Sequence, residues 1–439
     1  MRRDSGIALV KVLLLTLVLF AVAAYAARGT RVEVRVAQND YLGKRASQIA
    51  EAGLSRAWRQ IEQDLTNGQT LTQEVNGTAS FWSAGSSDST FSGYRFVSFG
   101  GGSTDGYHLY VANNSDDSGG SAGDNDKQVL ITSIGTISGS QREIQALLVQ
   151  VPLFGDGLYG KYVASISGGG NSNQSTDSYN SSTDPSHTTY LQHGTIGSNG
   201  DINLNGVPVA VHGDVTAAGT ASPGNSTVTG TVTSGAPQVA FPPAPSCPFS
   251  GYGAQPLNGS ISCTSTSGNH TSTCNPLNSS TGTLTGASSQ QITLSGGVYC
   301  FSSASITGQA TITVTGPVTM YLTSTNTATT FGGGGFVNYA QNGNSYAADL
   351  QIFSSYDSGG NSSNVGLIVM GGSSLYAAIY APEATIQMGG GGNNTFSFTG
   401  AAVGGAALLN GNVSFLYDEA LQNLTGKATE LVGWHEVFG

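Results

Sequence analysis

The hydrophobic pattern of the first 65 residues changes type partway along. Residues 7–27 would be apolar on every side of a helix, and Lys11 is the one charge among them. Beyond them, apolar residues recur at steps of three and four positions, which is typical of one apolar stripe on a helix. This stripe consists of Leu42, Ala46, Ile49, Ala50, Gly53, Leu54, Ala57, Trp58, Ile61 and Leu65. Because no proline precedes Pro152, the pattern predicts one helix over 7–65, about 88 Å long.

Residues 93–151 alternate between apolar and polar positions, as strands do. Clusters of Gly, Ser, Asn and Asp separate the runs "GYRFVSF", "GYHLYVAN", "KQVLITSIGTIS" and "SQREIQALLVQV". This spacing favours an antiparallel meander. We expect a small antiparallel sheet within a head over 66–155, with the apolar stripe of the helix covering one face of the sheet.

Short β-type runs separated by Gly or Asn continue from 156 to 425. Inward Ile, Val and Leu at every second position, with frequent turns, are what a β-solenoid or a sandwich requires. We expect a right-handed β-helix, because small residues at strand ends permit repeated tight corners; a β-sandwich is the alternative. The predicted fold class is α+β and predominantly β. Residues 236–248, "APQVAFPPAPSCP", concentrate proline and predict a linker or cross-over.

Composition and charge restrict the partners of the chain. Charged residues make up only 9% and Gly supplies 63 positions, which favours a turn-rich β body outside the cell. Residues 1–65 have a net charge of +4 and the rest of the chain has −15, and no Lys or Arg lies between Lys161 and Lys427. A surface without cations gains nothing from counterion release, so nucleic acid is excluded as a partner.

The four cysteines lie within 54 residues of each other and predict two disulfides in an oxidising compartment. They are Cys247, Cys263, Cys274 and Cys300. The competing interpretation is a zinc site, but there is no C-x-x-C pair and only His270 lies among them. Three connectivities remain open, and we expect a disulfide-tied insertion over 236–300.

The first residues resemble those of type IV pilins and type II secretion pseudopilins. A short basic leader, Met1 to Gly6, precedes "IALV" at the start of the apolar run. In that family a prepilin peptidase cuts after the glycine that matches Gly6, and the new N-terminal residue, here Ile7, is methylated. The resemblance implies a helix that lies first in the inner membrane and later in a bundle of like helices. Its contact residues would be Lys11, Val12, Leu13, Leu14, Leu15, Leu17, Leu19 and Phe20.

Lys11 departs from the pattern of the major pilins. They usually have glutamate at the fifth mature position, where it meets the N-terminal amine of a neighbouring subunit, and a lysine would repel that amine. The stretch "ARGTRVEVRVAQNDYLGKRASQIAEAGLSRA" resembles the minor-pilin branch. We therefore expect a tip or low-copy subunit rather than a shaft subunit.

Two other interpretations of the N-terminus stay open. Ala24-Tyr25-Ala26 fits the rule for signal peptidase, and a cut after Ala26 would give a free secreted protein. An uncleaved anchor would also contain an apolar run, although Lys11 leaves only the 16 residues from Val12 to Ala27, which is short for a span of roughly 20.

The C-terminal stretch "GAAVGGAALLNGNVSFLYDEAL" resembles a β-helical module found behind minor-pilin helices in bacterial surface proteins, and residues 417–421 carry this likeness. The resemblance implies no activity. Asp418 and Glu419 are neighbours on a predicted strand and would point to opposite faces, so they do not form a catalytic pair. We expect this segment to cap the end of the solenoid.

The sequence gives no catalytic residue, metal ligand or cofactor motif. Lyase chemistry on uronates generally uses Arg or Lys, which the body lacks between Lys161 and Lys427. Hydrolysis needs two carboxylates at about 5–9.5 Å, and the acids of the body are too scattered to be paired from sequence. They are Asp177, Asp184, Asp201, Asp214, Asp349, Asp357 and Glu383, and the histidines His187, His193 and His212 have no metal-ligand spacing. The acidic loop 114–127 lacks a calcium-binding order, and we expect it to be solvated.

These observations predict a leader at 1–6, a filament helix over 7–65, a sheet head over 66–155, a solenoid body over 156–425 and a tail over 426–439. The expected function is that of a non-catalytic minor pilin or pseudopilin-like subunit of a type IV pilus or type II secretion filament. Its partners would be other pilin subunits, the inner membrane before assembly, and a carbohydrate or surface ligand after export. The alternatives are an adhesin unrelated to pili and a β-helix polysaccharide hydrolase.

Overall fold

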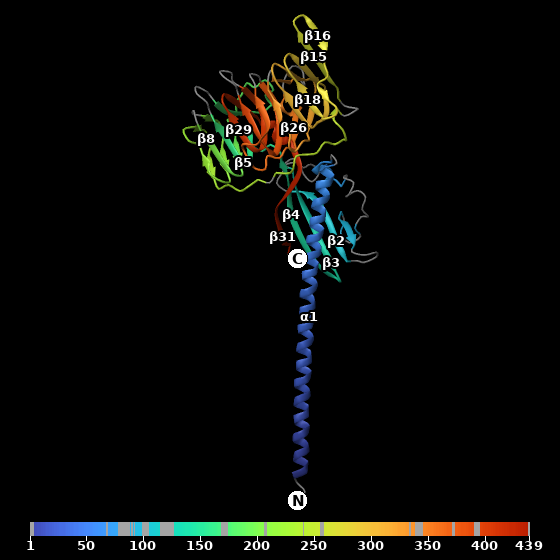
Figure 1. Cartoon of the computed structure of the whole chain (residues 1–439). Coiled ribbons are helices and arrows are strands. Elements are labelled where there is room, and N and C mark those ends of the chain that lie inside the picture. Colours follow the sequence, from blue (N-terminus) through green and yellow to red (C-terminus); the bar gives the residue numbers. More distant parts are fainter. Residues whose placement is uncertain are drawn as a thin grey trace. The chain divides into compact units, whose positions relative to one another are not determined.

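The computed structural model divides into two compact units, which are described separately. The head consists of residues 1–151 and 427–439, and the body consists of residues 152–426. The described residues are 4–66, 69–77, 88, 91, 93–98, 105–114, 127–167, 174–205, 209–239, 241–254, 259–332, 335–338, 346–370, 374–389 and 396–437. The acidic loop considered for calcium therefore lies almost wholly outside the described residues. Figure 1 shows the long helix of the head and the stacked strands of the body.

The head begins with one unbroken helix, α1 (Asp4–Thr66), of 63 residues. At 1.5 Å per residue it is about 95 Å long. From Leu9 to Tyr41 its residues are exposed throughout, whereas Gly43, Ala46, Ala50 and Ala57 are buried. A second, short helix, α2 (Leu71–Val75), begins with a capping box in which the side chains of Thr70 and Gln73 each bond the other's backbone amide.

Five strands form the sheet of the head, in the order β1-β2-β3-β4-β31. The pairs β1–β2, β2–β3 and β3–β4 are antiparallel. Ser138 and Gly139 join β3 to β4, and both have positive φ, as a two-residue hairpin turn of this twist requires. The last strand comes from the C-terminal residues, for which the sequence suggested only a tail. The strands are β1 (Arg95–Ser98), β2 (Gly106–Asn113), β3 (Gln128–Ile137), β4 (Ser140–Pro152) and β31 (Thr425–Val437).

Small residues let α1 lie directly on β3. A methyl group added to Gly135 of β3 would overlap the carbonyl oxygen of Ala46 and come within 2.6 Å of the amide nitrogen of Ala50. A methyl on Gly53 of α1 would stand 2.9 Å from the ring of Tyr107. The core of the head forms around this contact and includes Leu54, Ile61, Leu109, Ile131, Ile144 and Leu148.

The body starts with coils that stack outward from its first strand. β5 pairs in parallel with β7 and β8, and β6 pairs in parallel with β9. The next coil repeats these pairings one layer further on and ends at β13. The strands are β5 (Leu158–Ser167), β6 (Gln174–Tyr179), β7 (Ile196–Ser198), β8 (Asp201–Asn205), β9 (Val209–Val211), β10 (Val215–Ala217), β11 (Ala221–Ser222), β12 (Thr227–Val228) and β13 (Val232–Ser234).

A second run of coils follows and ends against the first strand of the body. β20 pairs in parallel with β23, β23 with β26, and β26 with β28. β28 then pairs with β29, which pairs with β30 and with β5. The strands are β14 (Gly253–Ala254), β15 (Ile261–Ser267), β16 (His270–Thr273), β17 (Leu277–Asn278), β18 (Thr283–Gly286), β19 (Gln290–Leu294), β20 (Gly297–Phe301), β21 (Ser303–Ile306), β22 (Thr311–Val314), β23 (Val318–Leu322), β24 (Thr329–Phe331), β25 (Gly335–Asn338), β26 (Leu350–Ser354), β27 (Val365–Met370), β28 (Ser374–Gly389), β29 (Phe396–Asn410) and β30 (Val413–Asp418), with short 3₁₀ turns η2 (Ala347–Asp349) and η3 (Glu419–Asn423).

One ladder of paired residues runs through both sets of coils. In spatial order its members are Tyr299, Met320, Ile352, Ile379, Ala402, Leu158, Ile196, Val215 and Val232. The first eight are at most 1% exposed, whereas Val232 at the end of the ladder is 44% exposed. Ala402, near the end of the body, therefore lies directly on Leu158, near its beginning. We call the β29–β5 and β30–β6 contacts the seam.

The seam places residues 417–421 in the middle of the stack, so the prediction that they cap its end is wrong. Asp418 pairs with Tyr179 of β6, and β6 pairs with β9 on its other side. The reason is that the coils are not stacked in sequence order: the chain starts in the middle, winds outward, crosses and returns. Coil length also varies, since Ile196 pairs with Val215, 19 residues later, and Val318 pairs with Leu350, 32 residues later.

The proline-rich segment 236–248 crosses along the side of the stack. The Asn199 amide group exchanges two 2.7 Å hydrogen bonds with the backbone of Val239. The ring of Phe241 lies 4.8 Å from that of Tyr159, and the Tyr380 hydroxyl donates to the Pro242 carbonyl at 2.6 Å. Proline suits such a path because the segment contributes no N–H groups to a strand ladder. The cross-over expected from the sequence thus passes from the β7 coil across the seam.

The fold class predicted from the sequence is confirmed: a long N-terminal helix is followed by a predominantly β chain. The described strand pairs of the body are parallel except for β14–β20, β15–β16, β15–β19 and β17–β18. Stacked parallel pairs are what a solenoid requires and a sandwich of antiparallel sheets does not. The right-handed sense of these coils stays a prediction.

Candidate functional site

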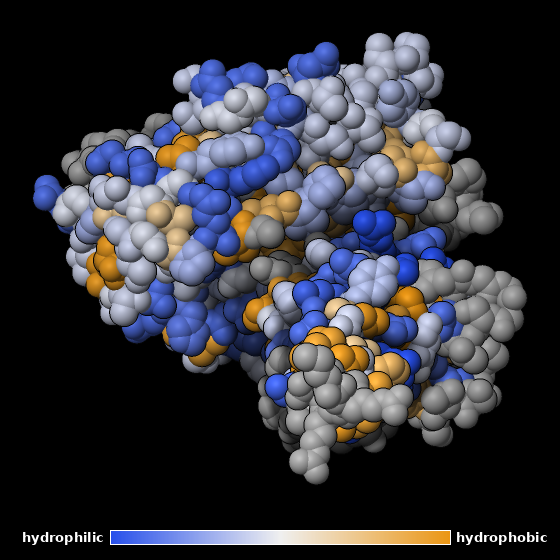
Figure 2. Space-filling view, turned by 90° about the horizontal axis from the view of Figure 1, so that it is seen from below, coloured by the Kyte–Doolittle hydropathy of each residue, from blue (hydrophilic) through white to orange (hydrophobic). Residues whose placement is uncertain are grey.

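The free half of α1, residues 9–41, presents apolar side chains that nothing in the described chain covers. The predicted contact residues Val12, Leu13, Leu14, Leu15, Leu17, Leu19 and Phe20 are 58–81% exposed. Lys11 is exposed as well, and at Gly6 and Ile7 the structure describes the helical backbone only. The helix is long and apolar enough to cross a membrane. In Figure 2, seen from below, apolar residues gather on the lower right, whereas most of the remaining surface is hydrophilic.

An exposed apolar surface of this size is an interaction surface. Fully burying a Leu or Val side chain is worth about 1.5–3 kcal/mol. Soluble monomers rarely leave such side chains together in water. Such a surface is typical of a segment that lipid or other helices cover.

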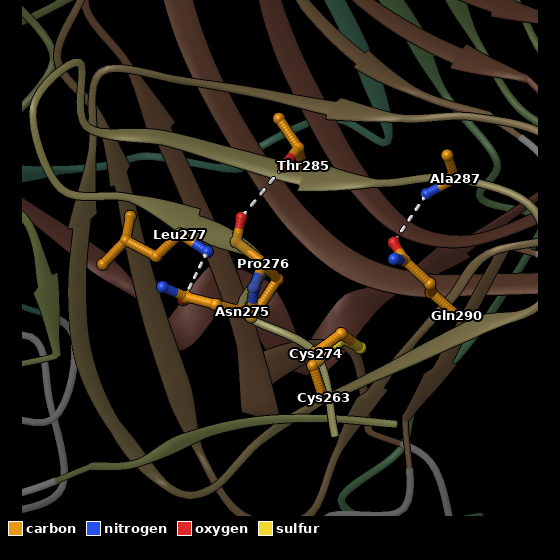
Figure 3. The surroundings of a disulfide bond; sticks show 8 residues. All are labelled: Cys263, Cys274, Asn275, Pro276, Leu277, Thr285, Ala287 and Gln290. Atoms are coloured by element: carbon orange, nitrogen blue, oxygen red, sulfur yellow. Dashed lines mark hydrogen bonds between the residues drawn. A yellow bond between two sulfur atoms is a disulfide. The ribbon is translucent and has the colours of Figure 1, made fainter. Parts of the chain in front are cut away.

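All four cysteines form disulfides, which excludes the zinc alternative. Cys247 bonds Cys300, and Cys263 bonds Cys274, with Cα–Cα distances of 5.9 and 5.0 Å. Figure 3 shows Cys263 and Cys274 beside the turn at Asn275 and Pro276, where the carbonyl of Pro276 accepts from Thr285. The first bridge fixes the crossing segment to β20, and the second ties β15 to the residue that follows β16.

Most carboxylates that the sequence left unpaired bind backbone amides at corners of the body. Asp184 accepts from the amides of Thr188 and Thr189 at 2.7 and 2.6 Å. Asp201 accepts from Thr220, Asp214 from Thr231 and Asp357 from Gly359. Asp349 is buried, and its burial raises its pKa. These acids hold turns in place and do not converge on one point.

Lys161, the only cation of the body, clamps the seam. Its ammonium pairs with the carboxylate of Glu383, which also accepts from the Tyr162 hydroxyl at 2.7 Å. Burial works to lower the pKa of Lys161, but the hydrogen bonds and charges of Glu383 and Tyr162 outweigh it and raise the pKa. A methyl group on Gly405 of β29 would stand 2.9 Å from the backbone of Glu383. The Lys161–Glu383 pair therefore links β5 to β28, and it does so next to Gly405 of β29, which has no side chain.

Two histidine–carboxylate pairs lie near the end of β6, one formed with a residue just after β9 and one with a residue of η3, and we call them the histidine corner. His212 Nδ1 lies 3.0 Å from Asp177 Oδ2, and His193 Nδ1 lies 2.8 Å from Glu419 Oε1. Ser178 donates to Glu419 and accepts from the His193 amide. Sequence reasoning missed this corner because Ser178 and Glu419 meet only across the seam. No group of three His, Cys, Asp or Glu among the described residues could hold a metal ion.

The N-terminal region of the chain is similar to a known family. Residues 5–55 match the PilX N-terminal family, and residues 302–424 match a domain of unknown function, DUF7305. No curated protein matches the chain. Among solved structures, the chain is similar to the competence-associated pilin ComZ from Thermus thermophilus, at 12% identity over 90% of this chain and 97% of that chain, with a TM-score of 0.22. That overlap is too loose to define a fold.

Together, the apolar helix and the family match make the N-terminal region of the chain similar to that of minor pilins. The matched residues 5–55 contain both the free half of α1 and the start of the half that packs on the sheet. The DUF7305 match runs from just before β21 to just after η3, so it contains most of the returning coils and one side of the seam. The description of this domain names no activity.

Proposed function

We propose that the chain is a non-catalytic minor pilin or pseudopilin-like subunit of a type IV pilus or a type II secretion filament. Prepilin peptidase would cut after Gly6, and Ile7 would be methylated. The subunit would cross the inner membrane once through the free half of α1 before assembly. It would then pack among pilin helices in a filament outside the cell.

The free half of α1 is the single observation that carries this proposal. It is a helix without a single buried residue in its most apolar 18-residue window, whose mean hydropathy is 2.4. The backbone already has its helical hydrogen bonds, so this segment enters lipid or a helix bundle without unpaired backbone groups. A secreted protein cut after Ala26 would discard this surface.

Lys11 supports a position at a filament tip or in a low-copy subunit. A cation at the fifth mature position repels the N-terminal amine of a neighbouring helix, because like charges in a site of low dielectric constant destabilise each other. A subunit at the end of a filament has one neighbour fewer to meet. We place the β-helical body outward, where its hydroxyl, amide and ring groups would contact a surface or a glycan.

Filament incorporation tests this function. Filaments sheared from cells that express the full chain should contain it, and removal of residues 7–27 behind a cleavable secretion signal should abolish incorporation while the body is still exported. A variant at the processing site, Gly6→Val, should stay in the membrane fraction and be absent from filaments. Incorporation of the shortened chain at the normal level would contradict the proposal.

A further inference from the structure

Three arginines lie on one side of the free half of α1, directly after its apolar run. The run from Val12 to Ala27 contains no charge, and Arg28 is the first residue beyond it. Arg31 and Arg35 follow, and all three arginines are exposed. At about 100° of rotation per residue, their side chains fall within about 60° of one another around the helix axis. We call Arg28, Arg31 and Arg35 the arginine face.

No acidic side chain of the helix neutralises the arginine face. Side chains on a helix meet at spacings of three and four residues, and the chain has no Asp or Glu at either spacing from these arginines. Arg31 instead meets Arg28 and Arg35 at these spacings, and such like-charged neighbours destabilise a helix slightly. None of the ion pairs among the described residues includes an arginine of this face. By contrast, Lys44 on the same helix pairs with Asp40 at 2.9 Å.

The acids of this part of α1 lie on a different side of the helix. Glu33 and Asp40 are the only Asp or Glu between residues 5 and 50, and both are exposed. Around the axis they lie about 140° and about 120° from Arg28, and about 20° from each other. An anionic surface that contacts the arginine face therefore meets three cations and no carboxylate of this helix.

The arginine face lies at the level of the headgroups when the apolar run crosses a bilayer. The 16 residues of the run rise about 24 Å, which is less than the hydrocarbon core of about 30 Å. For an untilted helix centred on the run, Arg28 lies about 2 Å inside the edge of the hydrocarbon, Arg31 about 2 Å outside it and Arg35 about 8 Å outside it. One headgroup layer is about 5–7 Å thick.

The length and direction of the side chains bring all three guanidinium groups into this layer. Arg28 reaches outward, because a long cationic side chain extends its charge to the membrane surface. The Cα–Cβ bonds of a helix tilt toward its N-terminus, so the side chain of Arg35 leans back toward the membrane. The three charges thus gather in the layer that contains the lipid phosphates.

The chemistry of the guanidinium group selects phosphate at this level. Its N–H groups form a planar fork that donates two parallel hydrogen bonds to phosphate oxygens. Anionic lipids attract arginines close to the membrane surface, and each cation contributes to this attraction. In phosphatidylcholine the choline cation neutralises the phosphate, whereas phosphatidylglycerol has a net negative charge. The arginine face therefore fits an anionic phospholipid better than a zwitterionic one.

We propose that the arginine face binds the phosphates of anionic phospholipids while the chain is in the membrane. These contacts fix the depth of α1 at the end of its apolar run, where the run is shorter than the hydrocarbon core. The inference rests on the membrane stage of the proposed function and names the lipid partner of the same helix. Carboxylates on the helix of a neighbouring pilin are the other possible anion, and the depth of the arginine face in the bilayer favours the lipid.

Lipid binding to the full chain in micelles of a neutral detergent tests this inference. Native mass spectrometry counts bound phosphatidylglycerol and phosphatidylcholine with the same acyl chains. We expect phosphatidylglycerol to bind at least tenfold more tightly. The triple variant Arg28→Ala/Arg31→Ala/Arg35→Ala should bind it at least tenfold more weakly, because each cation near an anionic surface contributes about fivefold. Its affinity for phosphatidylcholine should change less than twofold.

The matched control is Lys44→Ala/Arg45→Ala/Arg59→Ala, which removes the same charge from three exposed positions of the packed half. Lys44 lies about 24 Å beyond Arg28 along the axis, outside the headgroup layer. This variant should bind phosphatidylglycerol within twofold of the unaltered chain. Lys11 and the leader are the same in every variant, so they do not contribute to the difference.

Three results would overturn the inference. They are an unchanged affinity for phosphatidylglycerol in the arginine-face variant, an equal loss in the control variant, and displacement of the lipid by an equal concentration of glycerol 3-phosphate. An arginine-face variant that binds phosphatidylglycerol normally but is lost from filaments would assign the arginines to a neighbouring pilin helix instead. If the unaltered chain itself is absent from filaments, the proposed function fails, whereas the lipid result stands.

Discussion

The two halves of α1 have the same regular backbone and opposite surfaces. From Leu9 to Ala27 the helix carries mostly apolar side chains that are exposed on all sides, and the residues from there to Tyr41 are exposed as well. From Gly43 to Leu65 it carries a stripe of small and apolar residues that are buried on the sheet of the head. Helix propensity does not separate the two halves, because Leu, Ala, Lys and Arg are good helix formers in both.

The difference lies in where each half finds its partner. Small residues such as Ala46, Ala50 and Gly53 bring the second half so close to β3 that backbone meets backbone, which fixes it within its own chain. The first half has bulky Leu, Val and Phe that are exposed. A single helix thus contains one half that packs on the sheet of its own head and one half whose surface is left exposed.

The largest effect should come from charging the free half. Leu14→Lys together with Leu17→Lys places two cations in the apolar run, at about 3 kcal/mol each for a position near the centre of a bilayer. We expect the chain to be lost from the membrane fraction, as cell fractionation would measure. Ala52→Lys, on the exposed side of the packed half, is the matched control and should stay membrane-bound. A doubly charged variant that remains in the membrane would show that the free half is not the anchor.

The second largest effect should come from enlarging a glycine, which we expect to destabilise the head where the packed half of α1 lies and to have no effect in the free half. Gly135→Val drives a side chain into the backbone of α1 at Ala46 and Ala50, so overpacking should destabilise the head by about 3 kcal/mol. Hydrogen exchange in β3 and in residues 46–61 measures this loss. Gly29→Val adds the same atoms in the free half, where nothing lies within 4 Å, and should leave exchange in the head unchanged. Equal effects of the two substitutions would remove the distinction between the halves.

A smaller effect is expected where α1 meets the last strand. The Trp58 indole N–H donates to the Thr429 hydroxyl at 2.7 Å, and this hydroxyl donates to Glu62. Trp58→Phe removes the first bond and should weaken the attachment of β31 by about 1 kcal/mol, seen as faster hydrogen exchange in β31 alone. Tyr41→Phe, on the exposed side of the helix, is its control. Unchanged protection of β31 would mean that sheet pairing alone holds this strand.

The smallest change concerns position 11. Lys11→Glu replaces the repelling cation with an anion that would attract a neighbouring amine, and we expect several-fold more copies per filament. Quantitative mass spectrometry of sheared filaments gives the copy number. Lys44→Glu alters an exposed lysine outside the apolar run and should leave the number unchanged. A fall in copy number with Lys11→Glu would contradict the assignment to a tip position.

The sequence predicts those parts of the fold in which neighbours in space are close in the chain. The period of the helix stripe from Leu42 to Leu65 and the β3–β4 hairpin are of this kind, whereas the proline-rich cross-over was predicted from its local composition. The seam could not be predicted, because periodicity reveals that Ala402 and Leu158 point inward but not that they lie on each other. The histidine corner depends on the seam, and so it was out of reach as well. The cysteines predicted two disulfides. Which cysteine pairs with which could not be predicted, because it depends on where β15 and β20 lie in the fold.

The mature N-terminus tests the central claim most directly, because it decides whether the free half of α1 belongs to the working protein. Intact-mass and N-terminal peptide mass spectrometry of the chain recovered from filaments or membranes should give a protein that begins at Ile7 and carries one N-methyl group. A chain that begins at Ala27, after a cut at Ala26, would contradict the account, since the whole apolar run would then be discarded before the protein acts.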